Sequence, residues 1–306
     1  PATRYQEVSF DIQASTNFHY RPLWKPDKTL NDKTHTALQM QDWYAFKDPR
    51  QFYYGAYVQH RARLQDTAES HYAFFEKRQL VNNLSDEVKQ KIIQCLLPFR
   101  YVEQTANLHM MSGSAYGYGT VITQACIFAA MDRLGMAQYI SRIGLILDGN
   151  TGESLQQAKH AWLNDETWQP LRKLCEQSLT EQDWFKLYIL QNLLIDSMLQ
   201  ELVFGQLDEW LVENGGRDIA ILTEFMKDCL TDLAKWSDSV LKTAISESED
   251  NKTLIQSWIT ELLPQVKQAF SAWAQTALTD SGIDSGLNKI SERSKKTGNI
   301  LLDLAA

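Results

Sequence analysis

The sequence predicts an all-α protein, and three observations support this fold class. Apolar residues recur at intervals of three and four along most of the chain, as they do on one face of an α-helix. No alternation of apolar and polar residues is long enough to indicate a β-strand. Residues 180–207 are apolar on almost every side of a helical wheel, so they predict a central helix surrounded by others. We therefore expect one domain of about eight to ten helices.

The other helices are predicted from the same spacing and from residues that begin or bend helices. Asp48, followed by a proline at the first helical position, is expected to begin the first long helix, and Ser85 the second. Pro98 is expected to kink the second helix, and Pro264 the last one. Thr180 is expected to cap the central helix. The predicted ranges are 49–80, 85–111, 120–147, 153–163, 168–179, 218–240 and 254–273.

The chain is expected to divide into three parts. Residues 1–41 show no helical period and are expected to form an extended arm, residues 42–279 the helical domain, and residues 280–306 a polar C-terminal tail. Because the arm carries scattered aromatic residues, we expect it to lie over a partner protein rather than to be disordered. The candidates for contact with other subunits are Phe10, Phe18, Tyr20, Trp24, Trp43 and Phe46.

Composition disfavours several classes of function. The formal charge of −8 argues against nucleic acid or an anionic membrane as the main partner. No apolar run approaches the ~20 residues that cross a bilayer. The first residues resemble neither a signal peptide nor a transit peptide, so we expect a cytoplasmic location. The four cysteines lie far apart within apolar patterns and are expected to be buried free thiols.

Asp196 is a carboxylate in the middle of the apolar central helix. Such a residue is typical of a carboxylate-bridged metal site in a four-helix bundle, but a buried acid more often reaches an arginine, a solvated groove or a neighbouring subunit. A dinuclear site also needs two Glu-x-x-His pairs. In this chain only Asp32 precedes a histidine, His35, at that spacing, and both lie in the arm. The site cannot be assembled from this chain alone.

Other catalytic motifs are absent from the sequence. It contains no HExxH, no GxSxG and no phosphate-binding loop. The glycine-rich residues 113–119 lack the preceding strand and the third glycine of a dinucleotide loop, so they predict a turn or a close helix crossing. Glu103 and His109 lie six residues apart on the second helix, so they face different directions and structural roles are favoured. His160 is assigned no role.

Three motifs follow one another with a distinctive spacing. They are Asp42-Trp43-Tyr-Ala-Phe46-Lys-Asp48-Pro49 leading into Tyr53, Tyr54 and Tyr57, then Pro98-Phe-Arg100-Tyr101, and Ala130-Met-Asp132-Arg133-Leu134. In these motifs the chain resembles the β (small hydroxylase) subunit of bacterial multicomponent monooxygenases that oxidise phenol, toluene and related aromatics. Its start, PATRYQEVSF, and its length look most like the phenol hydroxylase branch, with the toluene monooxygenase branch as the close neighbour.

The resemblance implies a ferritin-like helical bundle related to a catalytic α subunit that carries a carboxylate-bridged di-iron centre. It implies an α2β2γ2 hydroxylase, a regulatory protein, and an NADH-dependent reductase with FAD and an iron–sulfur cluster. No cofactor, metal ligand or catalytic residue is expected in this chain. Matching its helices to the catalytic relative puts Asp196 at a Glu ligand, Trp236 near a histidine, and Arg133 and Met136 at the other Glu-x-x-His pair. These four residues would fill a former metal site, with Arg133 paired to Asp196.

Three classes of function are open at this point. The favoured one is a noncatalytic β subunit of phenol hydroxylase, which supports the di-iron α subunit in NADH- and O2-dependent hydroxylation of phenol and related aromatics in aromatic catabolism. The second is an independent ferritin-like oxidase with an unusual ligand set, which would bind iron stoichiometrically. The third is a helical adaptor or small-molecule-binding protein unrelated to oxygenases, which would be stable and monodisperse without a partner.

Overall fold

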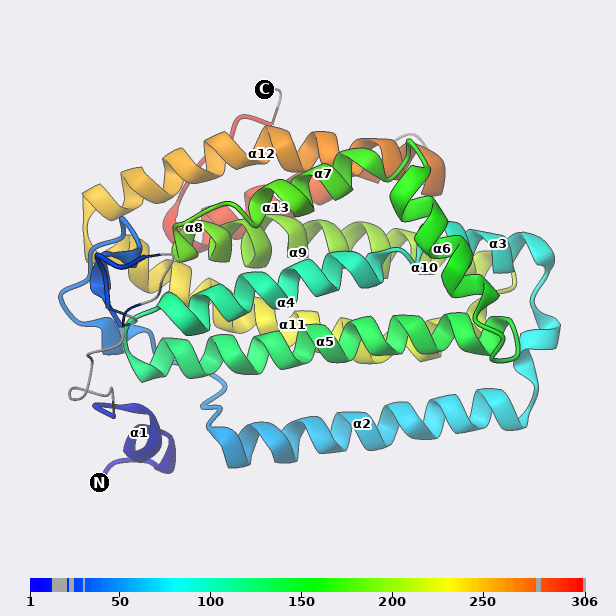
Figure 1. Ribbon diagram of the computed structural model, residues 1–306, viewed down its shortest axis with the longest axis horizontal. Coiled ribbons are helices and arrows are strands. Elements are labelled where there is room, and N and C mark those ends of the chain that lie inside the picture. The colour runs from blue at the N-terminus through cyan, green and yellow to red at the C-terminus, as the bar shows by residue number, and fades with distance from the viewer. Residues whose placement is uncertain (13–20, 22–24, 30, 279–281, 305–306) are drawn as a thin grey trace.

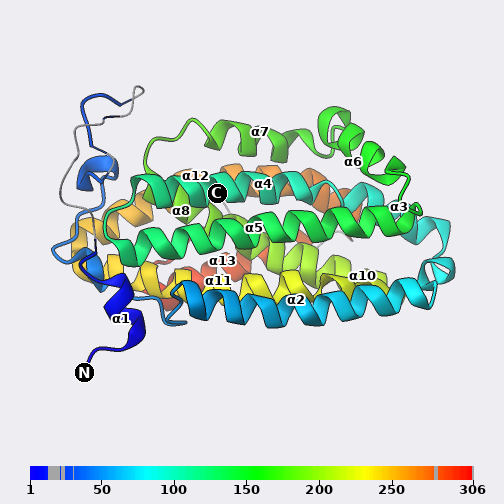
Figure 2. The same ribbon diagram turned by 60° about the horizontal axis from the view of Figure 1, so that its bottom comes forward.

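The structure, a computed structural model, is a bundle of long helices that run nearly side by side (Figures 1 and 2). It describes residues 1–306 except 13–20, 22–24, 30, 279–281 and 305–306, and within these ranges it contains no β-strand. The all-α prediction is therefore confirmed. None of the helices in the described part of the chain has the length and apolar character needed to span a membrane. The longest helices are α2 (Tyr54–Lys77), α4 (Phe99–Tyr116), α5 (Thr120–Leu147), α11 (Arg217–Glu247) and α12 (Glu249–Ala277).

Shorter helices connect and cover these long ones. The α-helical ones are α1 (Arg4–Ser9), α3 (Asp86–Cys95), α6 (Glu153–Asn164), α7 (Gln169–Ser178) and α13 (Gly282–Gly298). Single 3₁₀ turns are η1 (Lys33–His35), η2 (Trp43–Ala45) and η3 (Leu80–Asn83). The predicted helices at 120–147, 153–163 and 168–179 correspond to α5, α6 and α7. Ser85 caps α3 as expected, since its side chain accepts the Val88 amide.

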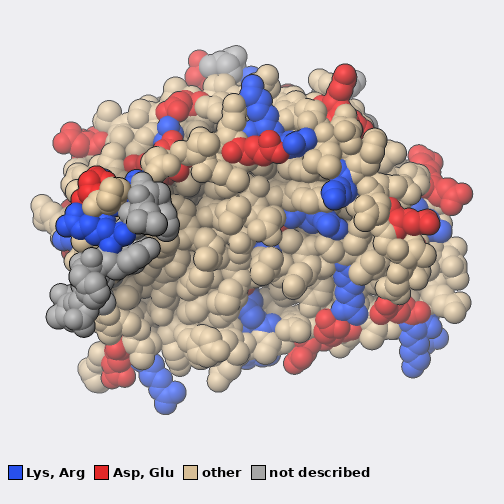
Figure 3. All heavy atoms as spheres, viewed as in Figure 1, with Lys and Arg blue, Asp and Glu red and all other residues tan. Residues whose placement is uncertain are grey.

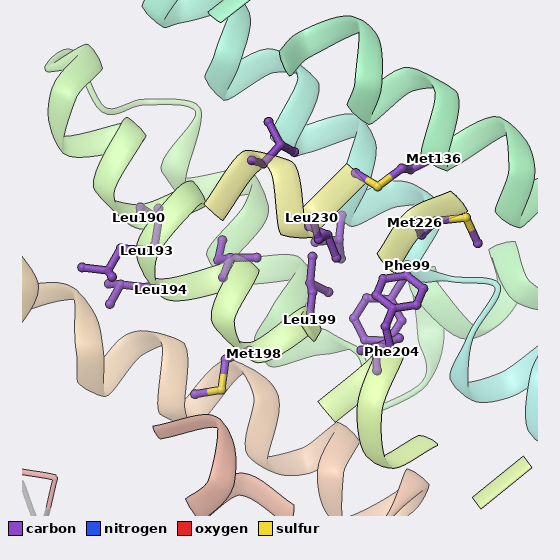
Figure 4. Close-up of a cluster of buried hydrophobic side chains, with 14 of the residues drawn as sticks. Phe99, Met136, Leu190, Leu193, Leu194, Met198, Leu199, Phe204, Met226 and Leu230 are labelled. Atoms are coloured by element: carbon purple, nitrogen blue, oxygen red, sulfur yellow. The ribbon is translucent and has the colours of Figure 1, made fainter. Parts of the chain in front are cut away.

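The central helix is confirmed as the axis of the core. It consists of α8 (Trp184–Ile189), the π-helical segment η4 (Leu190–Ile195), α9 (Asp196–Met198), the π-helical segment η5 (Leu199–Leu207) and α10 (Asp208–Glu213). Between its start and Leu199 every side chain except Lys186 is buried. Figure 4 shows Leu190, Leu193, Leu194 and Leu199 among side chains from neighbouring helices. Its cap is Asp183, which accepts the Phe185 and Lys186 amides, and not Thr180.

The first two predicted helices begin or end differently in the structure. α2 begins at Tyr54, because Asp48 accepts the Arg50 amide in a tight turn and Gln51 takes a positive φ of 53°. The second predicted helix is two helices, α3 and α4, which Pro98 separates rather than kinks. Two carbonyls at the end of α3 accept hydrogen bonds from tryptophans of other helices or turns. The indole N–H of Trp168 donates to Gln94 O at 3.0 Å, and the indole N–H of Trp273 donates to Cys95 O at 3.0 Å.

The C-terminal segment contains a helix that its polar composition does not reveal. α13 packs against α9, α11, α12 and η5, and its buried face consists largely of glycine and polar residues. Such a face leaves no apolar period in the sequence, which explains why these residues look like a tail. The preceding helix, α12, continues through Pro264 without interruption, and a bend there stays a prediction. All four cysteines are buried and free, as expected.

The described part of the N-terminal arm lies on this chain's own helices. Ser9 of α1 accepts hydrogen bonds from Thr120 and Gln124 of α5, and Phe10 is half-buried. Trp43 and Phe46 are buried against Trp184 and Phe185 within this chain, and their contact with another subunit stays a prediction. The other candidates of the arm, Phe18, Tyr20 and Trp24, lie outside the described residues.

Candidate functional site

A fully buried arginine, Arg133 of α5, lies between two carboxylates inside the bundle. Its Nη1 donates to Glu103 Oε2 of α4 at 3.3 Å, and its Nη2 donates to Asp196 Oδ2 of α9. The three side chains are at most 2% exposed. The predicted Arg133–Asp196 pair is therefore confirmed, and Glu103 is a partner that the sequence analysis did not assign.

The turn between α4 and α5 brings Glu103 and Arg133 together. Gly119 begins α5 with a φ of +87°, a conformation that favours glycine. Gly113 of α4 packs directly on α5, where an added Cβ would lie 2.8 Å from Cys126 Sγ. The glycine-rich segment is thus a turn with a close helix crossing, as predicted.

A chain of hydrogen bonds connects the charged cluster to Ser178 of α7. Gln191 Nε2 donates to Asp196 Oδ1 at 2.8 Å, so Gln191 Oε1 is an acceptor and lies 3.0 Å from His109 Nδ1. His109 Nδ1 therefore carries the proton. His109 Nε2 lies 2.7 Å from Ser178 Oγ, and the single proton of this hydroxyl is shared between Nε2 and the Cys175 carbonyl, which is also 2.7 Å away. Ser178 also lines a surface groove of about 240 Å³ beside α8 and α12.

Burial sets the protonation of this cluster. It raises the pKa of Glu103 to about 7, although the attraction of Arg133 opposes the shift. Burial also lowers the pKa of His109 to about 4, so this imidazole is neutral near pH 7. Burial alone would lower the pKa of Arg133, but Asp196 and Glu103 outweigh it and raise that pKa. The cluster therefore holds one permanent cation, and its total charge depends on Glu103 near neutral pH.

Replacing Glu103 with glutamine is expected to change how stability depends on pH. Because the pKa of Glu103 is raised on folding, the folded state binds a proton that the unfolded state has lost. This contribution is present below the ordinary pKa of 4.5 and is lost as the pH rises to about 7. The wild type should therefore lose stability relative to Glu103→Gln between these pH values. Urea unfolding at several pH values measures the difference; a pH-independent difference would contradict the assignment.

The cluster does not have the composition of a metal site. Within the described ranges, no three His, Cys, Asp or Glu side chains lie close enough together to hold a metal ion. The guanidinium of Arg133 occupies the space between Glu103 and Asp196, and its positive charge would repel a metal cation there. The arrangement can neutralise buried carboxylates and join α4, α5 and the central helix.

The two other residues of the predicted former site are also buried. Met136 is fully buried on α5, close to the core residues drawn in Figure 4. Trp236 of α11 is fully buried as well, with its ring edge-on to Tyr188 at 5.2 Å and the Arg50 guanidinium 5.2 Å from the ring centre. That these residues and the Arg133–Asp196 pair fill a former metal site stays a proposal.

A second ionic cluster fixes α2 to the bundle. Arg61 of α2 donates to both carboxylate oxygens of Asp132, at 2.8 and 2.7 Å, and to Asp232 of α11 at 3.0 Å. Tyr57 also donates to Asp132. Asp132 and Arg133 are neighbours in the sequence of α5. Asp132 binds Arg61 of α2, and Arg133 binds Glu103 and Asp196 in the interior.

The residues that sequence analysis missed are polar side chains buried on α4 and on the central helix. Glu103 and His109 face different directions on α4, as predicted, but both directions lead into the protein. Gln191 lies in the central helix, and residues 187–199 around it are all buried. A polar residue in such a position is the signal that could have identified it, since buried polar side chains require partners.

Comparison with known proteins relates this chain to oxygenases. The family model described as Methane/Phenol/Alkene Hydroxylase matches residues 24–248. The oxygenase component MhpL of phenol 2-monooxygenase from Acinetobacter pittii (strain PHEA-2) is 72% identical over 298 residues, 97% of this chain and 90% of that protein. The hydroxylase subunit beta of toluene-4-monooxygenase from Ectopseudomonas mendocina is 24% identical over 290 residues, 91% of this chain and 87% of that protein.

A solved structure gives the same result for the fold. Phenol hydroxylase from Pseudomonas sp. OX1 contains a chain that superposes with a TM-score of 0.92 and 45% identity, covering 97% of this chain and 90% of that one. The ferritin-like bundle that the resemblance implies is therefore confirmed. Together with the match of the family model, this similarity shows that the chain belongs to the methane, phenol and alkene hydroxylase family.

Proposed function

We propose that this chain is the noncatalytic β subunit of a phenol hydroxylase, which supports a di-iron α subunit in NADH- and O2-dependent hydroxylation of phenol and related aromatics. The identity with phenol 2-monooxygenase oxygenase components supports this function. The guanidinium between Glu103 and Asp196 supports a noncatalytic role. An α2β2γ2 assembly, a regulatory protein and a reductase with FAD and an iron–sulfur cluster complete the proposed system.

The observation that carries the role of a subunit is a face of α4 and α5 without exposed charge. Between residues 104 and 141 the only Asp, Glu, Lys or Arg side chains are Asp132 and Arg133, at most 3% exposed. Figure 3 shows a broad area over α4 and α5 in which charged side chains are sparse. Large apolar side chains at least 42% exposed lie on this face: Leu108, Met111, Met131 and Leu134. Exposed apolar patches and depletion of charge are typical of protein interfaces.

The α4–α5 face is large enough for a stable interface. α5 has 28 residues, a length of about 42 Å. α4 has 18 residues, a length of about 27 Å. Side by side, two helices of these lengths and a diameter of about 10–12 Å offer roughly 700–800 Å², close to the area that each partner contributes to a standard interface. Grooves of about 320 and 620 Å³ flank the exposed side of α5 and would receive partner side chains. An apolar helical surface of another oxygenase subunit fits this face. Contacts by Phe18, Tyr20 and Trp24 of the arm stay predictions.

Expression with and without the α subunit tests the proposed function. We expect iron in the purified complex and none bound stoichiometrically to this chain alone, because Arg133 occupies the space between the buried carboxylates. Metal analysis of both samples and hydroxylation of phenol by the complete system are the measurements. Stoichiometric iron in the isolated chain would favour an independent oxidase, and failure to form a complex with α would favour an adaptor.

A further inference from the structure

Arg293 of α13 binds the central helix beside Asp196. It is 5% exposed, and its Nη1 donates to the Asn192 carbonyl at 2.8 Å and to Ser197 Oγ at 3.0 Å. Its Nη2 donates to Ser237 Oγ at 2.8 Å and Asp238 Oδ1 at 2.7 Å, and its Nε donates to the same Asp238 oxygen at 3.0 Å. A guanidinium has five N–H donors, and all five are used. Arg293 therefore joins α13, α11 and the central helix.

The carbonyl that Arg293 binds is one whose usual α-helical donor bonds another carbonyl in a π-helical turn. In η4 the Asp196 N–H bonds Gln191 O, five residues back, whereas an α-helical amide bonds four residues back. The carbonyl that the Asp196 N–H would bond in an α-helix is the next in sequence, Asn192 O, which therefore does not receive its usual amide. A buried carbonyl without a donor is unfavourable. Arg293 supplies this donor from another helix.

Other contacts also fit α13 to the π-helical part of the central helix. Ser197 Oγ, which accepts from Arg293, itself donates to Leu193 O at 2.6 Å. Gly286 of α13 lies so close to the central helix that an added Cβ would collide with Met198 Sδ. The two helices thus approach closely at the place where the guanidinium reaches the backbone.

The π-helical turn determines the direction in which Asp196 points. Successive residues of an α-helix are rotated by about 100°, so a turn that contains an extra residue changes the orientation of the side chains that follow it. We propose that Arg293 is a positioning residue, which holds the π-helical turn of η4 and thereby keeps Asp196 directed at Arg133. This proposal depends on the contacts above and not on the proposed function.

Arg293→Met and Lys296→Met, made in the full-length chain, test the proposal. Methionine keeps the length of the side chain and removes its donors. Lys296 is the matched control, because it pairs with Asp238 at 3.6 Å and has no hydrogen bond to the central helix among those described. With Arg293→Met, amide hydrogen exchange in residues 190–199 should accelerate by about tenfold or more, as for loss of a charged hydrogen bond. Lys296→Met should leave it nearly unchanged.

A crystal structure and a pH profile distinguish positioning from general loosening. In Arg293→Met the Asp196 N–H should bond Asn192 O, and the Asp196–Arg133 contact should be lost. Because Asp196 contributes to the raised pKa of Glu103, the fall in stability that Glu103 causes should move to lower pH. Retention of the bond to Gln191 O, of the Asp196–Arg133 contact and of the pH profile would overturn the proposal.

A milder variant covers the case in which Arg293→Met does not fold. Ser197→Ala removes one of the acceptors of Arg293 and the hydroxyl bond to Leu193 O. Faster exchange confined to residues 190–199 in this variant, with an unchanged pattern elsewhere, would support the proposal. Exchange in this segment equal to that of the wild type would overturn it.

Discussion

Replacing Arg133 with methionine should destabilise the folded chain by about 3–5 kcal/mol, because removing one partner of a buried ion pair leaves an uncompensated charge. Asp196 would remain in the core with only Gln191 as a partner, and Glu103 would lose the cation that opposes its raised pKa. Urea unfolding of the purified chain at pH 7 measures the loss.

Two controls separate the charge effect from a change in packing. Arg142→Met removes a half-exposed ion pair with Glu69 and should cost less than about 1 kcal/mol. Combining Arg133→Met with Glu103→Gln and Asp196→Asn removes all three charges, and most of the stability should return. A loss below about 1 kcal/mol for Arg133→Met alone would show that the buried pair contributes little.

Introducing two glutamates on the α4–α5 face, Leu108→Glu with Leu134→Glu, should weaken binding to the α subunit by about 100-fold or more. Each charge would have to be buried without a partner at an interface whose exposed side chains are neutral. These leucines are 42% and 44% exposed, so the isolated chain should keep its stability. Co-purification with the α subunit and size-exclusion chromatography of the mixture are the measurements.

The matched control for this face is Phe74→Glu with Ile221→Glu. These residues are 53% and 40% exposed, comparable to the two leucines, but they lie on α2 and α11. Complex formation should be unchanged in this control. If both double variants bound α as tightly as the wild type, the α4–α5 face would not be the interface, while iron in the wild-type complex would still support the proposed function.

The fold could be predicted where burial leaves an apolar period, and not where other forces determine the structure. The central helix and α5 were predicted because their apolar residues report burial directly. α13 was missed because its buried face contains Gly286, Arg293 and Ser294, which fit by small size or by hydrogen bonding. At the break between α3 and α4, which Pro98 marks, the free carbonyls are bonded by Trp168 and Trp273, which are distant in sequence.

The candidate site could be predicted only in part for a related reason. Asp196 was identified because a single acid in an apolar helix is conspicuous, and the pairing with Arg133 came from the family resemblance. Glu103, His109 and Gln191 required the three-dimensional arrangement, because each is satisfied by a residue on another helix or at the end of a hydrogen-bonded chain. The π-helical turns at η4 and η5 were not predicted either, because the spacing of apolar residues does not distinguish them from an α-helix.

The two indoles that complete α3 have a consequence for synthesis of the protein. A chain leaves the ribosome from its N-terminus, so α3 emerges long before Trp168 and still longer before Trp273. Until both have been translated, the last carbonyls of α3 have water as their partner, and this corner of the bundle cannot take its final form. The N-terminal third of the chain therefore cannot complete its native contacts until most of the chain has been synthesised.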